Sequence, residues 1–387
     1  MEHTPQKLKI VYVTPALYMA GGVERVLTLK ANYFADHLGY DVTIVLTEGL
    51  GKPLFYPLSD KVKVVHLDIN FEALWTCSFI KKVFVYVGKQ YRFRKQLKAE
   101  LMRLRPDITV SMLRREINFI TSIKDGSRKV GELHVPRTFY RNLGNSILMK
   151  PLSKLWMSRL IGKLRQLDAF VVLTEKAKLT WPELTNVVVI PNPLSFPLPP
   201  ENIAHEKRVI AVGRYSDEKG YDLLLQAWTM IQGACPEWRL EVFGDGDRAP
   251  YEALIDQLHI DRRRCLLHER TTHIQEEYAK SSLLCVSSRF EGFGMMILEA
   301  MSCGLPVVSF DCPWGPRAVI THGDDGLLVE NGNVIQLATA LRELMTNDAR
   351  RQAMAKEAKG NAPWFQIDYI ASMWQSLFEG VMASKRL

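Results

Sequence analysis

Residues 191–207 read PNPLSFPLPPENIAHEK and carry five prolines, at positions 191, 193, 197, 199 and 200. Proline fixes one backbone torsion and lacks an N–H group, so this density excludes both a helix and a central strand. At 387 residues the chain is also too long for one ordinary hydrophobic core. We therefore predict two domains joined by this proline-rich stretch.

The two halves that flank the stretch share one pattern, in which short apolar runs alternate with helical segments. Such alternation is typical of βαβ units and predicts an α/β protein with a parallel sheet in each half. The clearest helical segments of the first half are 23–37 and 80–104. The expected strands are 9–13, 41–46, 62–67, 108–111, 129–133, 169–173 and 187–190 in the first half, and 208–213, 241–244, 265–268, 283–287, 306–310 and 326–329 in the second.

The segment 363–381 is strongly apolar at helical spacing and must pack against another part of the protein. We expect this helix to return to the first domain. The predicted organisation is a Rossmann-like domain over 1–195, a second one over 206–362, and a C-terminal helix over 363–387. Two open sheets of this kind usually face each other across a cleft, with ligands at the carboxyl ends of the strands.

The composition fits a soluble, cytoplasmic protein. Hydrophobic residues make up 47% of the chain, and no uninterrupted apolar run approaches the roughly 18–20 residues that span a bilayer. The amino-terminal stretch leads directly into an expected strand and lacks the pattern of a signal peptide. The six cysteines form no CxxC pair, so we expect reduced thiols and no metal site.

Positive charge is concentrated in the first half. Residues 1–200 have a balance of +14 and residues 201–387 a balance of −6, which together give the net charge of +8. Segment 77–105 has nine basic residues and one acid, and segment 145–167 has five basic residues and no acid. Both also carry large apolar residues at helical spacing, which favours contact with an anionic membrane surface. The alternative is that each is a surface helix with a solvated basic face.

Glycine-containing loops follow the first expected strand of each half. In the first, Gly21 and Gly22 lead into a helix whose free N–H groups suit an anion, although such a pair is often only a turn. In the second, Gly213 lets the backbone turn, and Arg214 and Lys219 bracket the loop before the next helix. Two cations in this arrangement can bind a diphosphate, whereas either alone would be an ordinary surface residue. We expect both cations to lie in an open cleft.

Glu132 and His134 follow an expected strand in the stretch GELHVPR, which ends in Arg137. A single histidine is most often structural, but Pro136 turns this segment at the carboxyl end of the strand, where ligands bind. The stretch VFGDGDRAP lacks the third glycine of a dinucleotide fingerprint, and is therefore poor support for NAD binding.

Two carboxylates stand eight residues apart in RFEGFGMMILEAMSCG, residues 289–304. Glu291 lies in a glycine-rich loop, whereas Glu299 lies within an apolar helical stripe, where burial of an unpaired acid is costly. Glu299 is therefore either at a helix edge in solvent or held for a ligand. Carboxylates accept hydrogen bonds from vicinal hydroxyls, and the N–H groups of Gly292–Gly294 suit phosphate or sugar hydroxyls. We interpret the pair as a nucleotide-sugar site.

The chain resembles a family-4 retaining glycosyltransferase of the GT-B fold. The resemblance rests on GGVERV, GELHVP, VGRYSDEKG, EGFGMMILEAMSCGLPVV with its Glu-x7-Glu pair, and DCPWGPRAVITHGDDGLLV, which occur in family order over about residues 9–335. The chain departs from many relatives at Val135, Met295 and Met296. The resemblance implies a nucleotide-sugar donor bound mainly by the second domain, an acceptor bound by the first, and neither a metal nor a cofactor.

The resemblance also implies roles for individual residues. It places Glu291 at the hydroxyls of the donor sugar, Glu299 at the ribose, and His134 beside the transferred sugar. The implied catalytic residues are His134, Arg214, Lys219 and Glu291. The implied binding residues are Gly21, Gly22, Glu132, Gly213, Arg270, Gly292, Phe293, Gly294, Met295 and Glu299.

We therefore predict a retaining transferase that moves a hexose from a UDP-sugar, such as UDP-galactose or UDP-glucose, to a membrane lipid or lipid-linked glycan. It would be a peripheral protein of bacterial polysaccharide or glycolipid synthesis at the inner face of the cell membrane. The alternatives are a GT-B nucleotide-sugar epimerase, which needs no acceptor, and a non-catalytic, membrane-docked subunit of a polysaccharide assembly complex. A nucleic-acid partner is not expected, because the cleft loops lack aromatic–basic platforms for bases.

Overall fold

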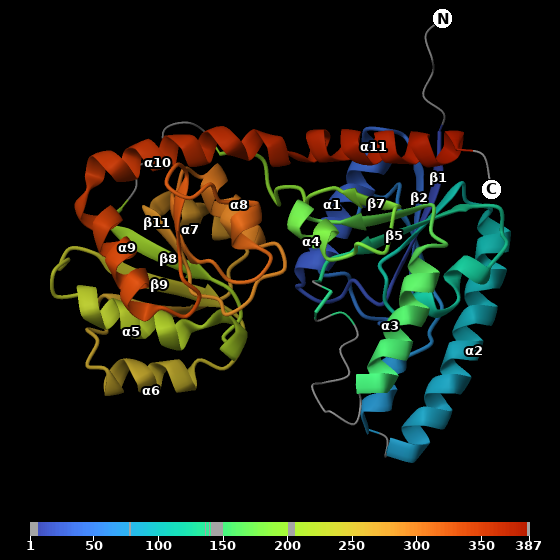
Figure 1. The fold of residues 1–387 in the computed structure, drawn as a ribbon, viewed down its shortest axis with the longest axis horizontal. Coiled ribbons are helices and arrows are strands. Elements are labelled where there is room, and N and C mark those ends of the chain that lie inside the picture. The colour runs from blue at the N-terminus through green and yellow to red at the C-terminus, as the bar shows by residue number, and fades with distance from the viewer. Residues whose placement is uncertain are drawn as a thin grey trace, which may run out of the picture. The chain divides into compact units, whose positions relative to one another are not determined.

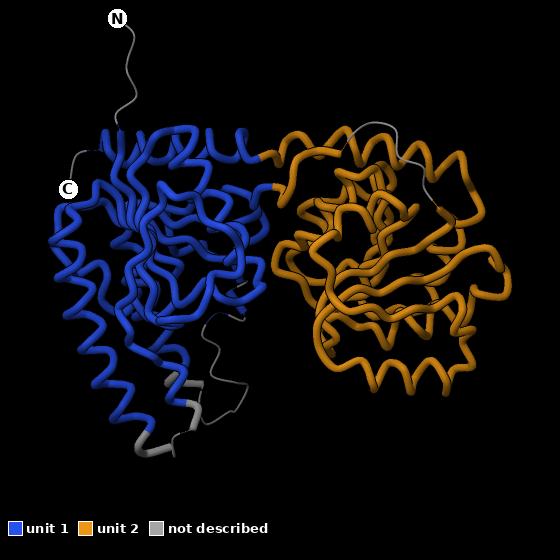
Figure 2. Tube along the Cα trace, turned by 180° about the vertical axis from the view of Figure 1, so that it is seen from behind, with its two compact units in different colours: residues 1–193, 367–387 blue, residues 194–366 orange. Residues whose placement is uncertain are grey.

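The computed structural model of the chain describes residues 7–76, 79–135, 137–138, 140, 150–199 and 206–384 (Figure 1). The chain divides into two compact units, Met1–Pro193 with Ile367–Leu387, and Leu194–Gln366 (Figure 2). It leaves the first unit inside the proline-rich stretch, of which residues 200–205 lie outside the described part. It enters the first unit again at Ile367. The second unit is thus an insertion between two parts of the first.

The first unit is built on a seven-stranded sheet in which all neighbouring strands are parallel. In order across the sheet, the strands are β3 (Lys63–His66), β2 (Asp41–Leu46), β1 (Lys9–Thr14), β4 (Ile108–Ser111), β5 (Arg128–Leu133), β6 (Ala169–Val172) and β7 (Val187–Val189). The central strands are rich in valine and isoleucine because helices cover both faces of a parallel sheet. The chain order reverses between β1 and β4.

One face of this sheet is covered by α1 (Gly22–Asp36) and α11 (Ile367–Ala383), which contact each other along the top of the unit in Figure 1. Tyr12 of β1 shares this core with Phe34 of α1 and with Trp374 and Phe378 of α11. The rings of Phe34 and Phe378 meet edge to face, with centroids 5.8 Å apart. The helix that follows the second unit therefore completes the core of the first.

The opposite face is covered by α2 (Phe79–Leu104) and α3 (Lys150–Leu164), and the short α4 (Glu175–Leu179) lies between β6 and β7. Val11 and Val13 of β1 point to this side because successive residues of a strand face opposite ways. From α2, the side chains buried here recur every four residues, at Phe93, Leu97 and Leu101.

The second unit has the same design with six parallel strands. In order across the sheet, they are β10 (Cys265–Glu269), β9 (Arg239–Gly244), β8 (Arg208–Val212), β11 (Leu283–Val286), β12 (Val307–Phe310) and β13 (Gly326–Val329). Its helices are α5 (Tyr221–Ile231), α6 (Ala249–Gln257), α7 (Ile274–Lys280), α8 (Met295–Ser302), α9 (Val334–Thr346) and α10 (Asp348–Asn361). Here the chain order reverses between β8 and β11.

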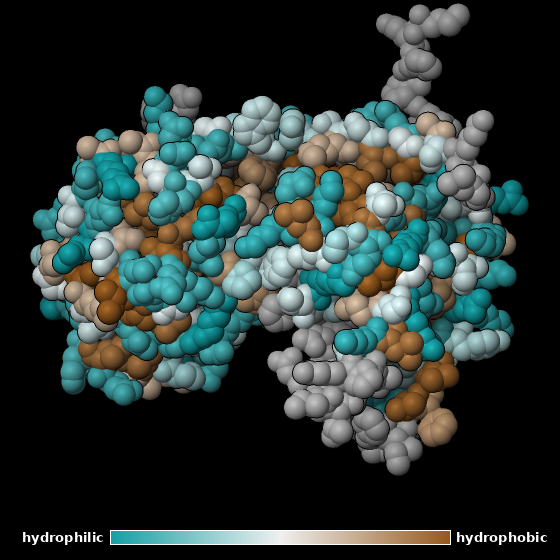
Figure 3. All heavy atoms as spheres, viewed as in Figure 1, coloured by the Kyte–Doolittle hydropathy of each residue, from teal (hydrophilic) through white to brown (hydrophobic). Residues whose placement is uncertain are grey.

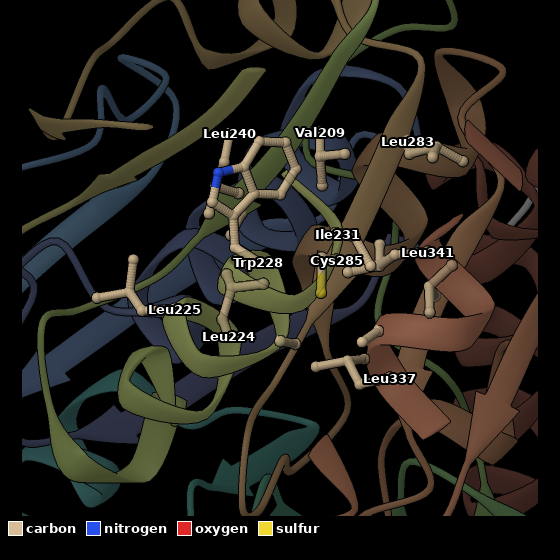
Figure 4. Close-up of a cluster of buried hydrophobic side chains, with 14 of the residues drawn as sticks. Val209, Leu224, Leu225, Trp228, Ile231, Leu240, Leu283, Cys285, Leu337 and Leu341 are labelled. Atoms are coloured by element: carbon tan, nitrogen blue, oxygen red, sulfur yellow. The ribbon is translucent and has the colours of Figure 1, made fainter. Parts of the chain in front are cut away.

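A tryptophan from α5 anchors the core of the second unit. Figure 4 shows the indole of Trp228 directed from α5 toward Val209 and Leu240 of the sheet, with Leu337 and Leu341 of α9 in the same cluster. The side chain of Trp228 is fully buried. Strands β8 and β9 are therefore held from one side by two helices.

The predicted fold class is confirmed, and every expected strand is present within two residues of its predicted bounds. The C-terminal segment differs from the single helix predicted over 363–381. Residues Ala362–Phe365 form a 3-10 turn, Gln366 is extended, and α11 begins at Ile367. Pro363 stands in the first turn of this short element, where its missing N–H group is tolerated.

We expect Phe378→Ala to lower the free energy of unfolding of the first unit by about 3–5 kcal/mol, because it leaves a cavity between α1 and α11. Tyr369→Ala, at a position of α11 that is 44% exposed, should change it by no more than about 0.5 kcal/mol. Urea denaturation of the two variants measures the difference. An unchanged unfolding curve for Phe378→Ala would contradict the role assigned to α11.

Candidate active site

The carboxyl edge of the second sheet carries most of the predicted site residues. Gly213 and Arg214 follow β8, Arg270 follows β10, and Glu291 follows β11. Strands β8 and β11 are the neighbours between which the chain order reverses. Open α/β sheets bind their ligands at such a reversal.

Lys219 and Glu291 form a buried ion pair at this edge. Nζ of Lys219 lies 2.5 Å from Oε1 of Glu291, and the two side chains are 11% and 7% exposed. Ser288 donates a hydrogen bond of 2.6 Å to the same Oε1. Lys219 is therefore largely buried, and the expectation that it lies open in a cleft is wrong. The sequence did not reveal this partner because the two residues are 72 positions apart.

Two glycines let the loops around this pair approach one another. A Cβ on Gly244 would lie 1.8 Å from the carbonyl oxygen of Gly213. Gly220 has a φ of 63°, and a Cβ there would lie 2.1 Å from the carbonyl oxygen of Ser287. A side chain at either position would force the backbone apart. Gly220 thus allows the loop that carries Lys219 to lie against the loop that carries Glu291, and Gly244 allows the end of β9 to lie against the loop after β8.

The loop that follows β12, residues 312–316, closes on Glu291 from the other side. Trp314 forms an isolated parallel bridge with Glu291, and its φ of 84° is rare for a residue with a bulky side chain. A Cβ on Gly315 would lie 2.7 Å from Cβ of Glu291. The DCPWGP motif therefore packs directly on the backbone that carries this carboxylate.

Glu299 lies in α8 and is 4% exposed. Tyr278 of α7 donates a hydrogen bond of 3.0 Å to Oε2, and the hydroxyl of Ser195 donates one to Oε1. The interpretation of Glu299 as a solvent-exposed acid at the helix edge is wrong. Its carboxylate accepts hydrogen bonds from hydroxyl groups in a buried site.

The remaining predicted residues of this unit are more exposed. The side chain of Arg214 is 72% exposed, and its nearest carboxylate oxygen, from Glu218, is 3.7 Å away. Arg270 lies 3.3 Å from Asp245 and is 49% exposed. Gly292, Phe293 and Gly294 lie between Glu291 and α8, and Met295 is the first residue of that helix. Within the described part of the chain, no group of three or more histidine, cysteine and carboxylate side chains could hold a metal ion.

Glu132 and His134 belong to the first unit, at the carboxyl end of β5. Oε1 of Glu132 accepts a hydrogen bond from Lys30 of α1, and Nε2 of His134 lies 2.9 Å from the same atom. Lys30 and Glu132 are each 1% exposed, and the imidazole of His134 is 6% exposed. Burial raises the pKa of Glu132, but Lys30 and His134 outweigh it and lower this pKa to about 2. Burial lowers the pKa of Lys30, against the opposing effect of Glu132.

The glycine loop of the first unit lies at the same edge as His134. Gly21 is the N-cap of α1 and Gly22 is its first residue. Val23, the next residue, lines a small pocket together with His134. The motifs GGVERV and GELHVP therefore come together in this unit, although Pro136 itself lies outside the described residues.

Arg137 is engaged in a structural contact. Two of its nitrogens donate hydrogen bonds of 2.8 Å to the carboxylate of Glu183. Its guanidinium also stacks over Trp181, 4.7 Å from the ring centroid. Both neighbours precede β7, so Arg137 connects the loop after β5 to the segment between α4 and β7.

The sequence interpretation missed the partners of the predicted residues. Tyr278 and Ser195 bind Glu299, Ser288 binds Glu291, and Lys30 binds Glu132. Lys30 did carry a signal, because it falls on the apolar face of the helix predicted over 23–37. The hydroxyl residues carried none, since serine and tyrosine are common in loops and helices alike.

We expect Lys219→Met to lower the free energy of unfolding of the second unit by about 3–5 kcal/mol, because it leaves Glu291 buried without a counter-charge. Arg214→Met should change it by no more than about 0.5 kcal/mol, since Arg214 is exposed. The double variant Lys219→Met/Glu291→Gln should recover most of the loss. Urea denaturation tests the three variants, and equal stability of the two single variants would contradict the ion pair.

Comparisons with known proteins agree with this architecture. Residues 199–361 match the family described as Glycosyl transferases group 1. The chain is 26% identical over 378 residues to an uncharacterized glycosyltransferase of Haemophilus influenzae, over 95% of this chain and 99% of that protein. It is 25% identical over 381 residues, 97% of this chain and 99% of the other, to the GalNAc-alpha-(1->4)-GalNAc-alpha-(1->3)-diNAcBac-PP-undecaprenol alpha-1,4-N-acetyl-D-galactosaminyltransferase of Campylobacter jejuni.

A solved structure extends the likeness to the whole fold. A TarM mutant of S. aureus, crystallised with fondaparinux, alpha-GlcNAc-glycerol and UDP, superposes with a TM-score of 0.75 at 16% sequence identity, over 96% of this chain and 99% of the other. The family match covers most of the second unit, and the two open parallel sheets are those of the solved structure. The chain therefore has the GT-B fold, and its second unit is similar to the group 1 glycosyl transferases over the matched residues.

Proposed function

We propose that the chain moves a hexose from a UDP-sugar to a lipid-linked glycan or membrane lipid, with retention at the anomeric carbon and without a metal ion. The observation that carries this proposal is the Lys219–Glu291 pair at the reversal of strand order in the second unit. TarM supports a UDP-sugar donor because it was crystallised with UDP. The C. jejuni relative supports the acceptor class because its name includes a PP-undecaprenol glycan. The product would be a bacterial polysaccharide or glycolipid.

In this proposal the second unit stabilises the leaving group by charge. As the bond between the anomeric carbon and the diphosphate oxygen breaks, its electron pair leaves with the UDP, and negative charge builds up on the phosphates. Lys219 and Arg214 supply fixed positive charge at that place, which lowers the energy of the transition state. The acceptor hydroxyl attacks from the same face of the sugar, and its proton passes to an oxygen of the β-phosphate.

The ion pair prepares Lys219 for this role. Because Glu291 and Ser288 hold the loop in place before any ligand binds, little reorganisation is needed during the reaction. Glu291 also offers carboxylate oxygens to the hydroxyls of the donor sugar, beside the backbone of Trp314. We propose that this contact tightens as charge develops on the sugar.

Glu299 has the character of a ribose-binding residue. Both of its oxygens accept hydrogen bonds from hydroxyl groups of the chain, those of Ser195 and Tyr278. The vicinal hydroxyls of a ribose are donors of the same kind. A ribose contact would persist through the reaction without change, so Glu299 is assigned to binding and Glu291 to turnover.

The test is to measure UDP and GDP release from a panel of nucleotide-sugars, with and without extracted membrane lipid. We expect release from a UDP-hexose that depends on lipid. Glu291→Gln should lower kcat by about 10²–10³-fold with little change in the Kd of UDP. Glu299→Gln should weaken UDP binding more than it slows turnover, since its contact is the same in ground and transition states.

A matched control is Glu237→Gln, which changes an acid that is 68% exposed and precedes β9 at the opposite edge of the sheet. It should leave both quantities unchanged. Failure to release a nucleotide from any donor would refute the function. Equal effects of the two site variants on UDP affinity would refute only the division of roles.

Helices α2 and α3 present a surface suited to an anionic membrane. Phe84, Val87 and Tyr91 of α2 are 76%, 61% and 72% exposed, and they lie outside the buried row that begins at Phe93. Leu155 and Trp156 of α3 are 51% and 39% exposed. Figure 3 shows brown, apolar atoms exposed at the lower right, where Figure 1 draws these helices.

We call the exposed residues of α2 and α3 the lipid-facing surface. Its exposed cations are Lys82, Arg92, Arg94, Lys95, Lys98, Arg103, Lys154 and Arg159, of which Arg103 pairs with Glu100. Lys89 is different, because it donates hydrogen bonds of 2.6 Å to the carbonyl oxygens of Ile69 and Asn70. Of the two basic segments predicted, residues 77–78 and 145–149 lie outside the described part of the chain. No described helix is long and apolar enough to cross a membrane.

We expect the chain to sediment with anionic vesicles at low salt. The triple charge reversal Arg92→Glu/Arg94→Glu/Lys95→Glu should abolish this binding, because each basic residue near such a surface contributes about 1 kcal/mol. Molar salt should release much of the bound protein, since the screening length then falls to about 3 Å.

The control is the reversal of three exposed cations of the second unit, Lys207, Arg263 and Lys356, which should leave vesicle binding intact. Both triple variants should bind UDP as the wild type does. If the wild type does not bind anionic vesicles at low salt, the lipid-facing surface is an ordinary solvated surface and the proposed membrane contact is wrong.

A further inference from the structure

Lys30 is a charged residue in the middle of an apolar helix face. It lies in α1, is 1% exposed, and has the buried residues Val26 and Phe34 one turn away on either side. An ammonium group in such a place is costly unless it is paired. Its partners are Oε1 of Glu132 and the rings of Trp374 and Tyr12, whose centroids are 4.3 and 5.8 Å from Nζ. The face of an aromatic ring attracts a cation, so the two rings and the carboxylate all stabilise the charge.

Glu132 depends on this ammonium in turn. Oε1 bonds with Lys30 and His134, whereas Oε2 is buried and has no hydrogen-bond partner within the described part of the chain. A buried carboxylate that accepts so few hydrogen bonds takes up a proton more readily than one in water. Lys30 is therefore the main group that keeps Glu132 ionised.

The protonation state of Glu132 decides where His134 carries its proton. An ionised carboxylate only accepts hydrogen bonds, so Nε2 of a neutral His134, 2.9 Å away, must be the donor. A protonated carboxyl group can donate instead, which would make Nε2 an acceptor and leave the ring proton on Nδ1. The other side of the imidazole would then change from an acceptor to a donor.

We propose that Lys30 is a positioning residue, which holds Glu132 as an acceptor and thereby keeps His134 in its Nε2–H tautomer. Trp374 of α11 belongs to the same arrangement because its ring covers the ammonium. The effect on the tautomer stands on the geometry of the first unit alone. The effect on catalysis rests on the transferase function proposed above.

Long-range ¹H–¹⁵N spectra of protein labelled with ¹⁵N-histidine distinguish the two neutral tautomers from imidazolium. The signal of His134 is the one that disappears in His134→Asn. In spectra recorded over a series of pH values, we expect the Nε2–H form in the wild type and its loss in Lys30→Met. A wild-type ring protonated on Nδ1, or a Lys30→Met ring that keeps the Nε2–H form, would overturn the proposal.

Lys129 provides a matched control because it is another buried lysine of the same unit. It is 6% exposed, and its Nζ lies 2.5 Å from Oδ1 of Asp125. It stands near the start of β5, roughly 16 Å along the strand from His134. Lys129→Met should destabilise the unit but leave the tautomer of His134 unchanged. A changed tautomer in this variant would trace the effect to lost stability and overturn the proposal.

Lys30→Arg covers the case in which Lys30→Met does not fold. It keeps a positive charge beside Glu132 and should retain the Nε2–H form. The wild-type spectrum needs no variant and tests the assigned tautomer by itself. An Lys30→Arg protein that folds and carries its proton on Nδ1 would count against the proposal.

The transferase assay tests the consequence for catalysis. We expect Lys30→Met to lower kcat by about 10-fold or more at an unchanged KM for the donor, and Lys129→Met to keep the wild-type kcat. In serine proteases, an imidazole in the wrong tautomer lowers kcat by about 10⁴-fold. A wild type that transfers no sugar would refute the proposed function, while the spectra would still decide the role of Lys30. A changed tautomer with unchanged kcat would show that Lys30 does not position His134 for the reaction.

Discussion

Every strand of both sheets runs parallel to its neighbours, and this constraint decides where the chain can carry chemistry. A parallel strand must be followed by a crossover, so the loops after the strands gather at one edge while helices cover both faces. Residues far apart in sequence then meet at that edge, as Lys219 and Glu291 do across 72 positions. The reversal of chain order between β8 and β11 opens the space in which such a pair can face a ligand.

Each unit buries a lysine–glutamate pair near the carboxyl edge of its sheet. In both pairs, Oε1 of the glutamate binds the ammonium together with one further side chain, His134 in the first unit and Ser288 in the second. Removal of two charges from water is costly, and a buried pair adds little net stability. The pairs instead specify geometry, because each carboxylate is fixed by a lysine from a distant segment and by a side chain two or three residues away. Both units therefore fix a buried glutamate with a lysine, and they differ in the third residue that binds the same carboxylate oxygen.

The architecture could be predicted from the sequence because local residue patterns determine it. Short apolar runs marked all strands, and the spacing of prolines marked the passage from one unit to the other. The sequence also indicated that Glu299 required partners, since an acid stood in an apolar stripe. It could not indicate which groups satisfy that acid, because Ser195 and Tyr278 reach it from distant segments. The burial of Lys219 was missed for the same reason.

The insertion of the second unit into the first has a consequence for synthesis. Trp374 and Phe378 belong to the core of the first unit, yet they leave the ribosome after the entire second unit. Domains generally fold as units while the chain is being made. Here the sheet of the first unit exposes the apolar face that α11 covers until this last helix has been synthesised. The second unit can finish folding before that. The nascent first unit therefore carries an exposed apolar face until synthesis of the chain is nearly complete.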